Sequence, residues 1–267
     1  MSKPNLPPEI LDRIIDFHNY DPETLMECCL VSKSWVPRAR MHLFARIRFR
    51  DRNDLELWNT MFPDPTNSPG WYTHTLAVGA LGDVGESSRG MQAFPRLEQL
   101  IVSCEWANSA TAKHTISLIP FHKFAPSLKH LNVSGPHIPA PQIVDIVRSL
   151  PLLEDLLLSG SDIDGQLDGL PAIAPPSTPL TLTGTLDILV SSRIARTLGR
   201  VLELPGGLHF QKIQLSLCYA QDIPLVTELV TACSDTLESL DITCKIDGAL
   251  HPDPLVNQSL TRTSSSG

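Results

Sequence analysis

The chain has 267 residues, of which 42% are hydrophobic, so it can bury a substantial core in one large domain or in a small module and a larger domain. Its formal net charge of -8 argues against general nucleic-acid binding, which relies on an excess of basic residues. Residues 1–50 contain eight Lys or Arg against six Asp or Glu, whereas residues 51–267 contain thirteen against twenty-three. This asymmetry predicts two regions with different roles.

The N-terminus lacks the apolar stretch of a secretory signal, and no run of eighteen apolar residues predicts a membrane span. The six cysteines form no CxxC pair and have no histidines at zinc-binding spacing. We therefore expect reduced, mostly buried thiols in a cytosolic or nuclear protein, with no cofactor, no bound metal and no membrane partner.

The first predicted element is a helix over residues 6–18. Its apolar side chains recur at helical spacing on one face, and Pro7 and Pro8 stand where a helix begins. Two more short helices are expected before residue 45. A module of this size is marginal when isolated, so we expect an external apolar partner to complete its core.

The second helix is expected after Asp21 and Pro22, which are the residue types of an N-cap and a first helical position. Leucine, methionine and cysteine side chains then share one face. A third helix is expected to be capped by Ser32 or Ser34 and to contain Trp35. Three short helices therefore occupy the first 45 residues.

The pattern changes to strict alternation at ARIRFRD, residues 45–51. Ile47 and Phe49 alternate with arginines, which is typical of a half-buried strand. An alternative interpretation is a basic nucleic-acid-binding stripe, for which the arginines are Arg38, Arg40, Arg46, Arg48, Arg50 and Arg52. The strand is favoured because no aromatic stacking platform accompanies the arginines and the following residues are acidic. Binding of oligonucleotides with a steep salt dependence would support the alternative.

An internal repeat follows this strand. The segments LEQLIVSC (97–104), LKHLNVSG (128–135), LEDLLLSG (153–160) and LESLDITC (237–244) share the pattern L-x-x-L-x-[VLI]-[ST]-[CG]. FQKIQLSL (210–217) fits the pattern approximately, and weaker copies occur at 73–79 and 179–184. The second apolar positions, spaced by 24 to 33 residues, are Ile47, Leu76, Leu100, Leu131, Leu156, Leu180, Ile213 and Leu240. Five good copies at a nearly regular step indicate a repeat architecture.

Helical patterns separate the copies. They follow Pro141, the serine pair at 191–192, and Asp222 with Pro224, whereas residues 161–178 lack periodicity and are expected to form a long loop. Alternation of strands and helices at a nearly fixed step predicts an α/β fold, a right-handed solenoid whose short parallel strands line the inner curve and whose helices cover the outer side. The strand pattern resembles irregular leucine-rich repeats.

The first 45 residues resemble an F-box, whose pattern is LPxEIL…I…L…L…V(S/C)(R/K)xW…L(W/F). Two halves carry the resemblance: LPPEIL at 6–11 with Ile14, and CLVSKSW at 29–35 with Leu43 and Phe44. The departures are Lys33 in place of a frequent arginine, Phe44 in place of a common tryptophan, and a slightly long HNYDPETL connection. Together with the repeats, the chain looks like the F-box/leucine-rich-repeat class.

This resemblance implies a non-catalytic subunit of an SCF (cullin–RING) ubiquitin ligase. Residues 1–45 would be the F-box, residues 46–250 the repeat solenoid that binds a protein substrate, and residues 251–267 a disordered tail. The F-box would bind the S-phase-kinase-associated adaptor and, through it, a cullin. By carry-over, the adaptor-binding residues would be Leu6, Pro7, Ile10, Leu11, Ile14, Leu30, Val31 and Trp35. Ile14 and Trp35 equally suit internal packing.

If the repeat leucines are buried, the alternate residues face the concave surface of the solenoid. This face is mainly small and polar, which suits a protein or peptide interface better than a phosphate-binding groove. The candidate substrate-binding residues are Gln99, Ile101, Ser103, His130, Asn132, Ser134, Asp155, Leu157, Lys212, Gln214, Ser239 and Asp241.

No nucleophile elbow, phosphate loop, dinucleotide fingerprint or zinc-protease motif is present, so an enzyme is not expected.

Alternatives stay open for the role of the chain and for the end of the repeat array. A protein-interaction scaffold without ligase activity is the main alternative to a substrate receptor. No apolar cap follows the last copy, so we expect either a truncated or alternatively spliced form, or a natural short array capped by residues 245–256.

Overall fold

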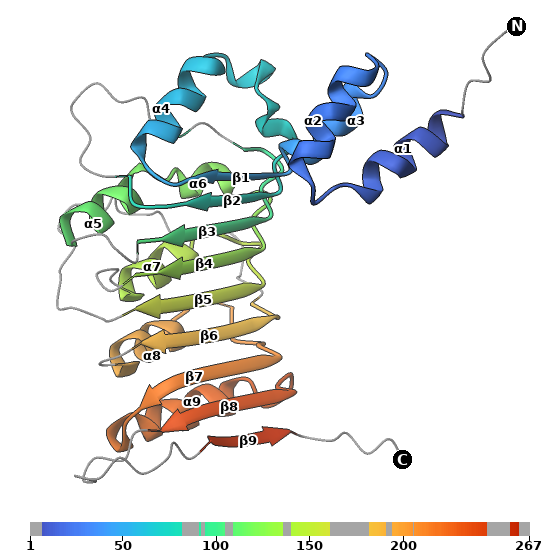
Figure 1. Cartoon of the computed structure of the whole chain (residues 1–267). Helices are drawn as coiled ribbons and strands as arrows, with labels where there is room; N and C mark the ends of the chain where they lie inside the picture. The colour runs from blue at the N-terminus through green and yellow to red at the C-terminus, as the bar shows by residue number, and fades with distance from the viewer. Residues whose placement is uncertain are drawn as a thin grey trace, which may run out of the picture.

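The computed structural model describes residues 7–81, 91, 94–104, 109–135, 140–160, 182–190, 194–204, 206–244 and 257–261. The chain starts with three helices, α1 (Pro8–Phe17), α2 (Pro22–Val31) and α3 (Val36–Leu43), as predicted. It then enters one large sheet with helices packed against it. Figure 1 shows the three helices beside the β1 end of the sheet.

The sheet follows the order of the chain, because each strand is hydrogen-bonded to the next one in sequence. The first eight strands are parallel: β1 (Arg46–Phe49), β2 (Thr75–Val78), β3 (Gln99–Ser103), β4 (His130–Ser134), β5 (Asp155–Gly160), β6 (Thr185–Val190), β7 (Lys212–Cys218) and β8 (Ser239–Cys244). The last strand, β9 (Asn257–Thr261), pairs antiparallel with β8. The predicted α/β class with short parallel strands is confirmed.

Helices occupy the connections between the strands. The α-helices are α4 (Arg52–Met61), α5 (Ser109–Leu118), α6 (Phe121–Phe124), α7 (Ala140–Val147), α8 (Ile194–Leu202) and α9 (Ile223–Ala232), and the 3-10 turns are η1 (Pro65–Asn67), η2 (Pro69–Tyr72) and η3 (Ala220–Asp222). In Figure 1, α6 to α9 lie behind the strands, on one face of the sheet. Parallel strands require such crossover connections.

The core lies between this helix layer and the sheet. Leucine and isoleucine side chains stand in register on neighbouring strands and are buried; they are Leu76, Leu100, Leu131, Leu156, Leu186 and Ile213. They pack against buried helix residues such as Val147 of α7 and Leu198 of α8. Each such side chain contributes about 1.5–3 kcal/mol of transfer free energy. The repeat leucines therefore define the core, as predicted.

The predicted position of one strand needs correction. The copy expected at 179–184, with Leu180 in register, is wrong, because β6 begins at Thr185 and Leu186 pairs with Leu156. The Thr-Gly sequence at 183–184 imitates the end of a repeat but forms the bend before the strand. A Cβ on Gly184 would lie 2.1 Å from Oδ1 of Asp155, so a larger residue there would displace this carboxylate.

A steric restriction explains why the last position of the repeat pattern is occupied by a small residue, cysteine or glycine. Gly135 and Gly160 have φ values of 151° and 154°, which side-chain-bearing residues rarely adopt. A Cβ on Gly160 would lie 2.0 Å from the carbonyl oxygen of Gly135. The backbones of successive repeats thus come close together where the strands end, and only small residues fit.

Three further expectations need correction or completion. The third helix is not capped by Ser32 or Ser34. Its N-cap is Trp35, whose side chain makes no capping hydrogen bond. The hydroxyl groups of Ser32 and Ser34 form a hydrogen bond with each other at 2.9 Å. Residues 257–261, within the C-terminal segment for which disorder was expected, form β9 and pair with β8. The proposed loop at 161–178 and cap at 245–256 lie outside the described residues.

Candidate functional site

The three N-terminal helices enclose a small core of their own. Ile15 of α1, Leu25 and Cys28 of α2, and Ala39 of α3 are buried together. The side chains of Cys29, Trp35 and Leu43 are partly buried against this core. The second helix is held at its start by Asp21, whose Oδ1 accepts hydrogen bonds from the backbone N–H groups of residues 23 and 24, so the predicted N-cap is confirmed.

The outer sides of α1 and α2 are apolar and exposed. We call the set of exposed large side chains on these two helices the helical apolar surface; its members are Ile10, Ile14, Phe17, Met26, Leu30 and Val31. Leu30 is 87% exposed and Phe17 is 85% exposed. Single exposed apolar residues are ordinary, but a set of this density on two successive short helices is typical of a protein-binding surface.

The exposure of apolar side chains is clearest on the second helix, α2. Leu25 and Cys28 face the small core, while Met26 and Leu30 are exposed on other sides of the same helix. A surface helix normally has one apolar stripe and one polar face. A helix that is apolar on several sides is normally buried on all of them, so α2 has the composition of a helix with a further partner.

The candidate adaptor-binding residues fall into three groups. Pro7, Ile10, Ile14, Leu30 and Val31 are exposed, and Leu11 and Trp35 are partly buried. Trp35 packs against the small core, so internal packing occupies part of its ring. Leu6 lies outside the described residues.

Phe17 and Met26 belong to the helical apolar surface but were not among the predicted contacts. Phe17 lies seven positions after Ile10 and three after Ile14, on the same helical face. Helical periodicity alone was therefore sufficient to include Phe17. Met26 had no such signal, because the apolar pattern of α2 does not distinguish its inner side from its outer side.

An ion pair fixes α1 against α3. Arg38 donates hydrogen bonds from Nε to Oδ1 and from Nη2 to Oδ2 of Asp16, both at 2.6 Å, and His42 Nε2 lies 2.7 Å from Oδ1. The Arg38 hydrogen bond, with a smaller contribution from His42, lowers the pKa of Asp16 to about 2. The pair holds the first helix in the orientation that leaves its apolar side exposed.

The arginines of the suggested basic stripe are largely engaged within the chain. Arg38 pairs with Asp16, Arg50 with Asp54, and Arg52 with Glu56. The guanidinium of Arg46 lies 4.5 Å from the ring centroid of Tyr20, and that of Arg40 lies 5.8 Å from the ring of Phe44. These interactions neutralise or occupy most of the stripe, which argues against its use as a nucleic-acid surface.

The second candidate site is the sheet face opposite the helices, which we call the open sheet face. The predicted alternation is confirmed in β3 and β4, where buried Leu and Val residues alternate with partly exposed ones. All the predicted substrate-binding residues lie on this face; Lys212 is exposed and the others are partly exposed. The register aligns them in rows, such as Gln99, His130 and Asp155.

A polar link crosses the middle of the open sheet face. His130 Nδ1 lies 2.6 Å from Oδ2 of Asp155, and Oδ1 of Asp155 accepts a short hydrogen bond from the backbone N–H of Thr185. Asp155 therefore joins β4, β5 and the start of β6. This arrangement orders the polar side chains at the centre of the face before any partner binds.

Asp187 also lies on this face but was missed, because its strand was placed six residues too early. It stands in register with Leu157 and Gln214. Burial raises the pKa of Asp187, Lys212 opposes the rise and Asp241 adds to it. No donor from the described residues reaches its Oδ1. The β6–β8 end of the face thus carries two carboxylates, Asp187 and Asp241, and one cation, Lys212.

The cysteines match the expectation of reduced thiols. All six are free, and Cys28, Cys104, Cys218 and Cys233 are buried. Burial raises the pKa of Cys218 to about 12, so this thiol is unreactive at neutral pH. The four buried cysteines pack within the hydrophobic cores.

Neither a membrane segment nor a metal centre is found in the described part of the chain. None of its helices is both long enough and apolar enough to cross a membrane. The same residues contain no group of three or more His, Cys, Asp or Glu side chains placed to hold a metal ion.

No family model, no curated protein and no solved structure matches the chain significantly.

Proposed function

We propose that this protein is a substrate-recognition subunit of an SCF (cullin–RING) ubiquitin ligase. In this proposal, α1–α3 form an F-box that binds the S-phase-kinase-associated adaptor, and the sheet with its helices is a divergent leucine-rich-repeat solenoid that binds a protein substrate. The subunit itself is not catalytic, because ubiquitin transfer takes place on other members of the complex.

The observation that carries the proposal is the helical apolar surface, found on the segment that resembles an F-box. Ile10, Ile14, Leu30 and Val31 are exposed in the chain and are also positions at which the F-box pattern implies adaptor contact. Covering one exposed leucine contributes about 1.5–3 kcal/mol of binding free energy. An adaptor that covers several of them would offset the cost of association.

The substrate role of the open sheet face is supported by its shape and order. Its residues come from successive strands in register, which creates a continuous surface of partly exposed polar and small side chains. Extended surfaces of stacked strand–helix repeats commonly bind proteins. The closing strand β9 lies beyond β8, so the face runs from the F-box-like end at β1 to the C-terminal end.

The test is a pull-down of the recombinant adaptor with purified chain. Wild type is compared with Leu30→Asp and with Leu57→Asp, a control at a leucine that is 59% exposed on α4. The proposal predicts binding by wild type and by the control, and loss of binding by Leu30→Asp. Trp35→Ala is avoided, because Trp35 packs against the small core and its loss would affect folding. Absence of binding by folded wild type would overturn the proposal.

A second readout separates the ligase subunit from the scaffold alternative. If the adaptor-bound chain also recruits a cullin and its captured partners become ubiquitinated in a reconstituted reaction, it acts as a substrate receptor. Adaptor binding without cullin recruitment or ubiquitination would instead identify a non-ligase interaction scaffold.

A further inference from the structure

A pocket of about 530 Å³ lies on the open sheet face over β1–β3. The register places Ala77 of β2 between Arg48 of β1 and Ile101 of β3. Ala77 and Gly79 are too small to fill the space between their longer neighbours, so the face is hollowed at β2. Gly79 cannot be larger, because a Cβ there would lie 2.2 Å from the carbonyl oxygen of Arg50.

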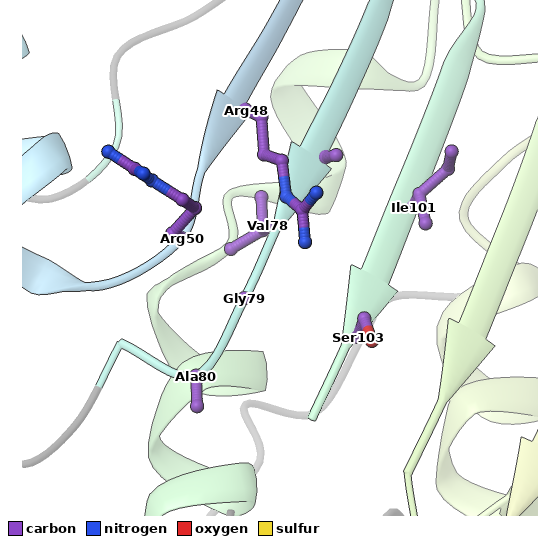
Figure 2. Close-up of a pocket in the computed structure, with 8 residues that line it drawn as sticks. Arg48, Arg50, Val78, Gly79, Ala80, Ile101 and Ser103 are labelled. Atoms are coloured by element: carbon purple, nitrogen blue, oxygen red, sulfur yellow. The ribbon is translucent and has the colours of Figure 1, made fainter. Parts of the chain in front are cut away.

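Arg48 supplies a positive charge to this hollow. Its side chain is exposed, and Figure 2 shows it crossing the β2 ribbon, with the guanidinium between β1 and β3. Among the described residues, no carboxylate lies within 4.0 Å of it, whereas Arg50 on the rim is paired with Asp54. Within the part of the chain that the structure describes, the hydrogen-bond donors of Arg48 are therefore available to a ligand, and Ser103 lines the same pocket.

The charges on the open sheet face are unevenly distributed. Arg48 lies at the β1 end, whereas the β5–β8 half carries the carboxylates of Asp155, Asp187 and Asp241 and one cation, Lys212 of β7, so that half has an excess of acidic groups. Neighbouring strands are about 4.8 Å apart, so a ligand of a few residues fits beside Arg48 without reaching the acidic half. A polyanion that ran along the face would be repelled there, which disfavours nucleic acid.

We propose that this pocket binds an anionic side chain of a protein partner, either a carboxylate or a phosphate ester, with Arg48 as its bidentate donor. Guanidinium groups match both anions in geometry. The partly exposed Ile101 lines the pocket and offers apolar contact to the atoms that carry the anionic group. The inference rests on the proposed substrate role of the open sheet face, and it specifies the chemistry of the substrate: an acidic or phosphorylated segment.

The test uses arrays of degenerate peptides whose central residue is fixed as glutamate, phosphoserine, serine or lysine. The full chain is applied as wild type, Arg48→Gln, Ala77→Leu and Arg46→Gln. We expect wild type to bind glutamate-centred or phosphoserine-centred peptides at least about tenfold more strongly than serine-centred or lysine-centred ones, as one charge-assisted bidentate contact provides. The comparison of glutamate with phosphoserine identifies the source of the anion.

The variants separate the pocket from general charge. Arg48→Gln removes the donor and Ala77→Leu fills the hollow without changing charge, so both abolish the preference. Arg46→Gln removes the same charge from the same strand outside the pocket lining, so it preserves the preference. Equal binding of all four arrays, or an unchanged preference in Arg48→Gln, would overturn the proposal. Binding of a single-stranded oligonucleotide instead of peptides, with a steep salt dependence, would also overturn it.

The result of the peptide-array test can be interpreted separately from the F-box proposal. The peptide arrays use the chain without the adaptor, and Arg48→Gln is expected to retain adaptor binding because Arg48 lies on β1, outside the helical apolar surface. Loss of the peptide preference with intact adaptor binding overturns only the pocket. Failure of adaptor binding with an intact preference overturns only the ligase role.

Discussion

Asp16 and Arg38 are 22 positions apart, yet the guanidinium of Arg38 engages both carboxylate oxygens of Asp16 at 2.6 Å. The pair joins α1 to α3 across the small core of the N-terminal helices. Because α1 contributes one buried side chain to that core, Ile15, the ion pair is an important second attachment of this helix. It therefore supports the surface to which we assign adaptor binding.

Asp16→Asn is expected to lower the free energy of unfolding of the helical unit by about 1 kcal/mol at pH 7. The depression of the Asp16 pKa from 3.8 to about 2 corresponds to about 2.4 kcal/mol, which solvent reduces because the side chain is 35% exposed. Because the pKa of Asp16 is depressed in the folded state, the ion pair stabilises the fold fully above pH 3.8. This stabilisation is lost as the pH falls through 2.

The measurement is urea unfolding followed by circular dichroism between pH 7 and pH 2. Wild type and Asp16→Asn should differ at pH 7 and converge near pH 2. Asp12→Asn, an exposed acid on the same helix, should change stability less. A constant difference between wild type and Asp16→Asn at all pH values would contradict the assignment.

Asp187→Asn is expected to stabilise the protein at neutral pH. Burial raises the pKa of Asp187 above 3.8, so ionisation of this carboxyl opposes folding. The resulting destabilisation is complete at pH values above the folded-state pKa and is absent below pH 3.8. Thermal unfolding should show a higher Tm for the variant at pH 7, and the gain should shrink as the pH falls toward 3.8. Asp235→Asn, at an exposed turn, is the control and should show no such trend.

Gly160→Ala is expected to destabilise the sheet by about 1–3 kcal/mol, because φ is 154° there and the new Cβ would meet the carbonyl oxygen of Gly135. Gly199→Ala is the matched control. Gly199 lies within α8, and a Cβ there meets no atom within 4 Å, so alanine should stabilise by about 0.4–1 kcal/mol. Chemical denaturation of both variants measures the contrast. Equal effects would contradict the close approach of the repeats at Gly160.

Much of the sheet could be predicted from local patterns. Leu100, Leu131 and Leu156 recur within the same motif, and their strands pair in the register that the motif implies. The sixth strand was misplaced because Leu180 precedes a Thr-Gly pair like that at a repeat end, whereas Leu186 lies in a stretch without that ending. A short degenerate motif cannot choose between two such leucines, since packing decides the register.

The candidate sites depended more on contacts between distant residues. The exposed positions Ile10 and Ile14 follow from helical spacing, but the division of α2 into an inner Leu25 and an outer Leu30 depends on how three helices pack. The repeat register, with Ile47 and Leu76 at equivalent positions, already places Ala77 beside Arg48, but sequence alone does not show that the small residues there leave a hollow. The face was therefore predicted as a surface of few charges, without its basic hollow.

The most direct test of the account is the affinity of the purified chain for the recombinant adaptor, measured by titration calorimetry. The account predicts a defined complex with wild type and with Leu57→Asp, and at least about a tenfold weaker complex with Leu30→Asp, since a covered leucine contributes about 1.5–3 kcal/mol. Circular dichroism confirms that all three chains are folded. Equal affinities for Leu30→Asp and Leu57→Asp, or no binding by folded wild type, would contradict the assignment of the helical apolar surface to the adaptor.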